Sequence, residues 1–172
     1  MIVLITGPPG AGKTTTAKAL AQRFKRSALI AVDLIRNMVV CGRTHAWDHT
    51  PESRQQLQLA TTNSIYLARQ FDDHDFVALI DDVAFGQTLL AYEAAFKKRD
   101  FRTILLLPSG KTLAQRDRQR VRFAMGPRSK ELRHKFNKHR NRSHWTEIDN
   151  SELTVAQTVQ RILEKIPKEK KA

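Results

Sequence analysis

The feature that most constrains this chain is a glycine-rich stretch close to its start, Gly7-Pro8-Pro9-Gly10-Ala11-Gly12-Lys13-Thr14. It matches the phosphate-binding pattern G-x-x-x-x-G-K-[ST] at every fixed position. Before it, the apolar residues 1–5 predict a short buried strand. After it, Ala17, Leu20 and Phe24 recur at the spacing of one helical face. A strand, a glycine loop and a helix in this order are the context that a phosphate-binding loop requires.

The residue types in this loop indicate how it would bind a nucleotide. Glycines allow backbone N–H groups to turn inward around phosphate oxygens, and the following helix directs its positive end at the same anion. We expect Lys13 to contact the β- and γ-phosphates and the Thr14 hydroxyl to bind Mg²⁺. Every residue from Gly7 to Thr15 is therefore predicted to contact the nucleotide, ATP in our interpretation.

Composition bounds the remaining possibilities. The chain has 172 residues, of which 41% are hydrophobic, and this length suits one domain (residues 1–172) with its own core. Cys41 is the only cysteine, so no intramolecular disulfide can form, as is usual in a reducing compartment. No apolar run is long enough to span a membrane. We expect a cytoplasmic protein without a membrane partner.

The net charge of +13 is concentrated in one segment. Residues 111–144 contain 12 Lys and Arg against two acidic residues, a net charge of +10. Helical patterns on both sides of Gly126-Pro127 suggest two basic helices that form a lid over about residues 110–143. Arg116 and Arg120 lie four residues apart and are therefore neighbours on one helical face. Such a cluster could also bind nucleic acid, whereas a charge run alone is most often a solvated face.

Two acidic sites follow apolar strands. Asp33 comes after residues 28–32, at the edge of a parallel sheet where ligands bind, and Arg36 follows one helical turn later. We interpret Asp33 as the base that activates an acceptor hydroxyl and Arg36 as an acceptor-binding residue, although Asp33 could simply cap a helix. Asp81 and Asp82 end the apolar residues 76–80. Asp81 is the preferred ligand, through water, of Mg²⁺, and Asp82 is expected to orient water or substrate.

Residues 41–50 form a loop that contains His45, Trp47 and His49. No third metal ligand lies at a convincing spacing, so a substrate-facing loop with Trp47 as an apolar wall is the preferred interpretation. The alternation of strands and helices along the chain predicts an α/β fold, a parallel sheet covered by helices on both faces.

The chain resembles small kinases of the P-loop superfamily over nearly its whole length. The resemblance rests on residues 7–14, Asp33, Ile80-Asp81-Asp82-Val83, Arg116-x-x-x-Arg120 and Ile148-Asp149-Asn150-Ser151. It implies a three-layer P-loop sandwich with a five-stranded parallel sheet and a basic lid. It also implies that the loop at Asn150 and Ser151 contacts the adenine, and that the lid residues Arg116 and Arg120 contact the phosphates as catalytic residues.

Two families share further features with the chain. The combination of Asp33 with Asp81-Asp82-Val83 is similar to chloramphenicol phosphotransferases and their relatives, and Asp33-x-x-Arg36 is similar to polynucleotide 5′-hydroxyl kinases. In both families the residue matching Asp33 is taken as the base, which implies an ATP- and Mg²⁺-dependent kinase of a hydroxyl-bearing acceptor. We favour a small-molecule acceptor.

Three alternatives stay open at this point. A polynucleotide 5′-hydroxyl kinase is favoured by the net charge and Arg36, but no aromatic stacking platform is evident in the sequence. A nucleoside monophosphate kinase is disfavoured because an anionic acceptor needs no base. A non-catalytic module, in which ATP closes the lid to form a basic surface for RNA, would tolerate the change Asp33→Asn. The oligomeric state and a preference for ATP over GTP do not follow from the sequence.

Overall fold

The computed structural model describes residues 1–118, 127–138 and 145–166. Five strands form one sheet, and they are β1 (Ile2–Thr6), β2 (Ser27–Ala31), β3 (Val77–Asp81), β4 (Phe101–Leu106) and β5 (Trp145–Ile148). The helices within these ranges are α1 (Lys13–Ala21), α2 (Val32–Arg36), α3 (Pro51–Asp73), α4 (Gly86–Phe96), α5 (Gly110–Arg118), α6 (Pro127–Lys138) and α7 (Val155–Leu163). None of these helices is long and apolar enough to cross a membrane.

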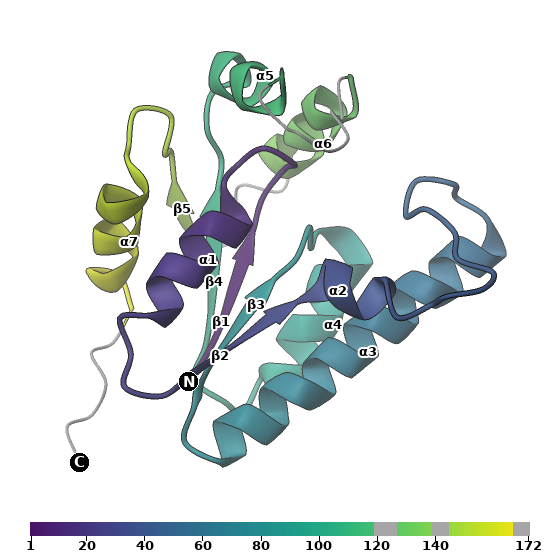
Figure 1. Ribbon diagram of the computed structural model, residues 1–172, viewed down its shortest axis with the longest axis horizontal. Coiled ribbons are helices and arrows are strands. Elements are labelled where there is room, and N and C mark those ends of the chain that lie inside the picture. The colour runs from purple at the N-terminus through teal and green to yellow at the C-terminus, as the bar shows by residue number, and fades with distance from the viewer. Residues whose placement is uncertain (119–126, 139–144, 167–172) are drawn as a thin grey trace.

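All pairings in the sheet are parallel, and the strand order is β2-β3-β1-β4-β5. The first strand of the chain is therefore the central one, with β3 on one side and β4 on the other. Every residue of β1 and β3 is buried, which explains why both strands are continuous apolar runs with no alternation. The carboxyl ends of all five strands meet at one edge, and this edge carries the phosphate-binding loop (Figure 1).

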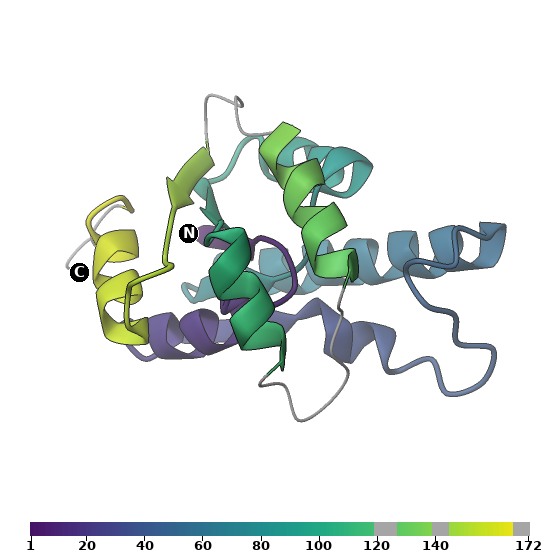
Figure 2. The ribbon, with the colours of Figure 1, turned by 90° about the horizontal axis from the view of Figure 1, so that it is seen from above.

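Helices cover the two faces of the sheet as separate layers (Figures 1 and 2). On one face, α1 and α7 pack on Val3, Ile5 and Leu79, with Leu20 and Ile162 fully buried. On the other face lie α2, α3 and α4. Their core residues are Val32, Ile35, Ala60, Ala68, Leu89, Tyr92 and Phe96. The protein is thus a three-layer α/β sandwich, as predicted.

A third, smaller cluster lies beside the sheet. Phe136 of α6 is fully buried against Leu105 and Leu107, and Val83, Phe85 and Trp145 pack around it. The rings of Phe85 and Phe136 meet edge to face, with centroids 5.5 Å apart. Helix α6 is therefore attached to the strand-end segment that follows β3.

Local predictions match most helix boundaries. Thr50 caps α3 by accepting a hydrogen bond from Ser53 N at 3.1 Å, with a proline in the first turn. Thr154 and Gln157 form a capping box at the start of α7. Leu67 of α3 and Val155 of α7 are 36% and 39% exposed, because these positions face solvent.

Candidate active site

The loop between β1 and α1 has the backbone shape of a phosphate cradle. Gly7, Gly10 and Gly12 adopt φ angles of +146°, +87° and +88°, a region that L side chains rarely enter. Ala11 N donates to Pro8 O at 3.1 Å and closes the turn. The Lys13 ammonium donates to the same carbonyl at 3.3 Å, so the side chain folds back over the loop. The backbone N–H groups of the loop and the Lys13 ammonium thus form a concave, positively polarised surface.

Gly7 is required for packing as well as for conformation. A Cβ placed on Gly7 would lie 2.2 Å from Leu106 O of the neighbouring strand, and this backbone oxygen cannot move away without disturbing the sheet. We expect Gly7→Ala to lower the free energy of unfolding by several kcal/mol or to prevent folding, since a strained φ adds to the clash. Urea denaturation followed by circular dichroism measures this. Gly110→Ala is the control, because nothing lies within 4 Å of its added Cβ; equal midpoints for the two variants would contradict the prediction.

Two of the predicted metal-binding residues are in contact. Thr14 Oγ1 donates to Asp81 Oδ2 at 2.5 Å, joining the first turn of α1 to the end of β3. Burial raises the pKa of the Asp81 carboxyl, while the Lys13 charge and the Thr14 hydrogen bond lower it. A hydroxyl beside a carboxylate at the mouth of a phosphate loop is the donor set that Mg²⁺ uses with nucleotide phosphates. These residues therefore fit the implied metal.

The structure places Asp82 differently from its predicted role in orienting substrate. One carboxyl oxygen accepts from Val83 N at 2.7 Å, and the other accepts from the Tyr92 hydroxyl at 3.0 Å. The Tyr92 hydroxyl also lies 2.7 Å from Ser64 Oγ, so a buried polar chain joins β3, α4 and α3. Both oxygens of Asp82 are thus engaged inside the protein. No sequence motif signals this chain of hydrogen bonds.

Burial raises the pKa of Asp82 to about 6, although the Tyr92 and Val83 hydrogen bonds act in the opposite direction. When the pKa of a carboxyl is higher in the folded than in the unfolded state, the folded protein loses stability as the pH rises between the two values, here between about 4 and 6. We expect Asp82→Asn to match the original protein at pH 4 and to be more stable at pH 7.5, by at most about 3 kcal/mol. Urea unfolding at both pH values tests this, and a difference independent of pH would contradict it.

Asp33 lies at the edge predicted for it, in the first turn of α2 after β2. Its side chain is 88% exposed, and one carboxylate oxygen lies 3.8 Å from Arg36 Nη1. The Asp33 charge is a minor contribution to the raised pKa of Asp81 and Asp82, behind burial. The structure therefore brings Asp33, Arg36 and Asp81 to one side of the phosphate loop.

The segment after β5 contacts the phosphate loop directly. Asn150 is 3% exposed, and its Nδ2 donates to Ala11 O at 2.9 Å, while its buried Oδ1 has no hydrogen-bond partner among the described residues. Arg116 Nη2 of α5 donates to Asn150 O at 2.9 Å. A buried acceptor without a donor is costly unless a ligand or water supplies one. Asn150 thus fits a donor group on a bound nucleotide.

Other predicted residues have different outcomes. The Ser151 hydroxyl accepts from Ser109 N at 2.7 Å and donates to Asp149, so it holds two loops together. Arg120 lies outside the described residues. In the loop 41–50, the rings of His45 and Trp47 stack with centroids 4.6 Å apart, so an aromatic platform exists that the sequence did not reveal. Within the described ranges no three metal-ligating side chains cluster.

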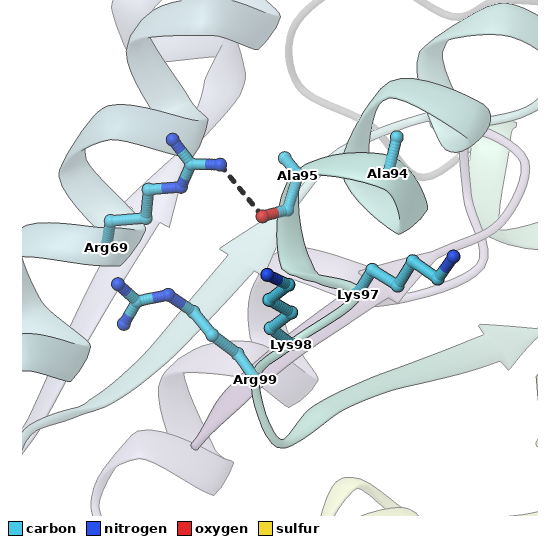
Figure 3. A pocket seen from close by; sticks show the side chains of 6 residues that line it. All are labelled: Arg69, Ala94, Ala95, Lys97, Lys98 and Arg99. Carbon is cyan, nitrogen blue, oxygen red and sulfur yellow. Dashed lines mark hydrogen bonds between the residues drawn. The ribbon is translucent and has the colours of Figure 1, made fainter.

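A hollow of about 450 Å³ lies at the opposite edge of the sheet, at the end of α4 (Figure 3). The arginine side chains that line it form bonds between secondary-structure elements. Arg69 of α3 donates to Ala95 O at 2.8 Å, and Arg99 binds the carboxylates of Asp72 and Asp73, which lowers the pKa of Asp73. We therefore interpret this hollow as a structural junction between α3 and α4.

Solved structures show the same fold. A tunicamycin resistance protein from Deinococcus radiodurans superposes with a TM-score of 0.66 at 20% identity, over 95% of this chain and 94% of that one. A shikimate kinase from Acinetobacter baumannii gives 0.65 at 20% identity over 95% and 91%. A gluconokinase from Sinorhizobium meliloti 1021 gives 0.63 at 17% identity over 94% and 89%.

Sequence comparisons add one family. No curated protein matches the chain. A family profile described as "AAA domain" matches residues 2–145, which include the phosphate loop, Asp33, Asp81 and helices α5 and α6 of the basic segment. This match covers most of the 172 residues, and the fold around it is that of the small P-loop kinases. The chain therefore belongs to the AAA domain family.

Proposed function

We propose that the protein is an ATP- and Mg²⁺-dependent kinase that transfers the γ-phosphoryl group to a hydroxyl of a small molecule. The observation that carries the proposal is the contact between Thr14 and Asp81 at the mouth of the loop that holds Lys13, with Asp33 on the same side. The shikimate kinase and the gluconokinase with this fold are named for small-molecule acceptors, which supports the choice of acceptor.

In this proposal each residue has a separate task. Asp33 accepts the proton of the acceptor hydroxyl while that oxygen forms a bond to the γ-phosphorus. The bond between the γ-phosphorus and the bridging oxygen breaks, and ADP leaves. Lys13 and Arg116 hold the phosphate oxygens, where charge spreads in the transition state. Thr14, and Asp81 through water, would hold Mg²⁺, which when bound would neutralise charge on the phosphates. Arg36 positions the acceptor beside Asp33.

The experiment is phosphoryl transfer from γ-labelled ATP with Mg²⁺ to separate pools of alcohols, nucleosides and 5′-hydroxyl oligonucleotides. We expect labelled product in the alcohol pool and less of it with Arg116→Ala. Arg102→Ala is a matched control, because that arginine is half exposed and pairs with Asp100 away from the loop. Label that remains in ATP or appears only as inorganic phosphate, with every pool, would contradict the proposal.

A second function is favoured by one observation. The described part of the basic segment presents exposed Lys111, Arg118 and Lys130, and the stacked His45 and Trp47 could hold a base. A polynucleotide 5′-hydroxyl kinase would place label in the oligonucleotide pool. Each phosphate contact would then steepen the salt dependence of binding by about 0.7 in log–log slope.

A further inference from the structure

One residue of the segment after β5 holds the outer side of the phosphate loop. Asn150 is 3% exposed, and its Nδ2 donates to Ala11 O at 2.9 Å. A Cβ placed on Gly12 would lie 3.7 Å from the same Nδ2. Ala11 is itself fully buried, so the amide reaches the loop from the protein interior. Asn150 therefore fixes the carbonyl of the peptide that joins Ala11 to Gly12.

The orientation of this peptide decides where the next donor points. The peptide is planar and trans, so the carbonyl of Ala11 and the N–H of Gly12 point in opposite directions. With the carbonyl directed outward at Asn150, the Gly12 N–H is directed toward the concave side of the loop. In the part of the chain that the structure describes, nothing accepts a hydrogen bond from Gly12 N. The bond from Asn150 thus aims an available donor at the place of a phosphate.

The main chain of Asn150 holds a second phosphate-binding group. Arg116 Nη2 donates to Asn150 O at 2.9 Å, and Nη1 of the same guanidinium would lie 4.0 Å from a Cβ on Gly12. Helix α5 also lies against the loop at Leu113, which a Cβ on Gly10 would contact at 3.4 Å (Figure 2). A guanidinium has five N–H donors, and the bond to Asn150 leaves others for an anion. Asn150 thus contacts the loop through its side chain and the lid arginine through its carbonyl.

An amide at position 150 is not the choice that favours stability alone. Its Oδ1 is buried and has no hydrogen-bond partner among the described residues, and an unpaired buried acceptor lowers stability. Leucine has nearly the same shape without that acceptor. The amide adds the donor to Ala11 O, which leucine lacks.

We infer that Asn150 is a positioning residue, which aligns the Gly12 N–H and the Arg116 guanidinium on the phosphates of the bound nucleotide. This inference rests on the proposed function for the identity of the ligand, and it assigns the residue that organises the phosphate site. Asn150 acts through the loop and α5, and the base of the nucleotide plays no part in that action. Loss of the side chain should therefore weaken any ligand that carries the phosphates, whether or not a base is attached.

The test compares two ligands, a non-hydrolysable ATP analogue and inorganic tripolyphosphate, each titrated calorimetrically in the presence of Mg²⁺. We expect Asn150→Leu to weaken both by the same factor, roughly tenfold or more, the size of one charge-assisted hydrogen bond. Asn150→Ala removes the same donor with a smaller side chain and should give the same result. The melting temperature of each variant should stay within a few degrees of the original, because the unpaired Oδ1 is lost together with the donor.

Two further variants locate the effect. Thr158→Ala is the matched control, because Thr158 is 1% exposed and donates to a backbone carbonyl at 2.9 Å, that of Thr154, within α7. It should leave both affinities unchanged. In the Arg116→Ala background, Asn150→Leu should cause a smaller loss of affinity than in the original protein, because two residues that contact each other and one ligand are energetically coupled.

The outcomes separate this inference from the proposed function. A loss confined to the ATP analogue overturns the inference, because Asn150 then contacts the base, and so does failure of tripolyphosphate to bind the original protein. Independent effects of Asn150→Leu and Arg116→Ala also overturn it, since the guanidinium then does not depend on Asn150. A fall in melting temperature of more than about ten degrees in both Asn150 variants shows a structural role instead. Equal losses for both ligands in a protein that transfers no phosphate to any alcohol support the inference and contradict the kinase.

Discussion

Replacement of Lys13 by alanine is expected to reduce phosphoryl transfer by roughly 10²-fold or more, the usual cost of removing a group that stabilises transition-state charge. The Lys13 ammonium lies over the phosphate loop, bonded to Pro8 O, and no other described side chain donates to that carbonyl. The substitution leaves the glycine backbone in place, so nucleotide should still bind, with lower affinity. Turnover with labelled ATP and the best alcohol acceptor measures the effect.

Two controls make the Lys13 result interpretable. Lys25→Ala removes an exposed lysine beyond the end of α1 and should leave turnover within a factor of two. Because Lys13 is buried, the melting temperature of Lys13→Ala must also be measured, and it should stay within a few degrees of the original. Near-normal turnover in a folded Lys13→Ala protein would place the nucleotide site elsewhere.

Asp33→Asn is expected to reduce transfer by roughly 10²-fold or more, the scale of a positioned general base. Asparagine keeps the size and can still accept a hydrogen bond from the acceptor hydroxyl, but it cannot take the proton. The Asp33 side chain is 88% exposed and contributes little packing, so ATP affinity should change only a few-fold and stability should hardly change. Calorimetric titration with an ATP analogue and a kinetic assay on the same sample test both parts.

A structural role for Asp33 leads to a different result. If the carboxylate only supports the first turn of α2, asparagine replaces it well and turnover is unchanged. The matched control is Asp75→Asn in the turn before β3, where a φ of +61° suits asparagine equally. Unchanged turnover in Asp33→Asn would remove it as the base.

The central part of this architecture could be predicted from local pattern. The phosphate loop, the five strands and the caps of α3 and α7 each follow from side chains within a few positions of one another. Residues at the carboxyl ends of parallel strands share one edge, so Asp33 and Asp81 could be placed together before their distance was known. Thr14 and Asp81 are in contact at that edge, and the Asp33 charge contributes to the raised pKa of Asp81.

What could not be predicted depends on contacts between distant segments. Asp82 looks like a site residue because it follows Asp81, yet the Tyr92 hydroxyl of α4 donates to it and is itself hydrogen-bonded to Ser64 of α3. The attachment of α6 through Phe136 could not be predicted either, since a single phenylalanine within a basic segment forms no pattern that indicates which residues it packs against. Local propensity carries no information on such pairs, because tertiary packing alone brings them together.

The link between Asn150 and Ala11 joins residues 139 positions apart and has a consequence for how the molecule is made. During synthesis β1 precedes its sheet neighbours β3 and β4, so its strand pairings cannot form until both have been made. Such non-local pairings make us expect slow folding. The carbonyl of Ala11 gains its side-chain donor only when the segment after β5 has left the ribosome. A nascent chain that ends before Asn150 would lack this donor, so we expect the phosphate loop to be complete only after the segment that follows β5 has been synthesised.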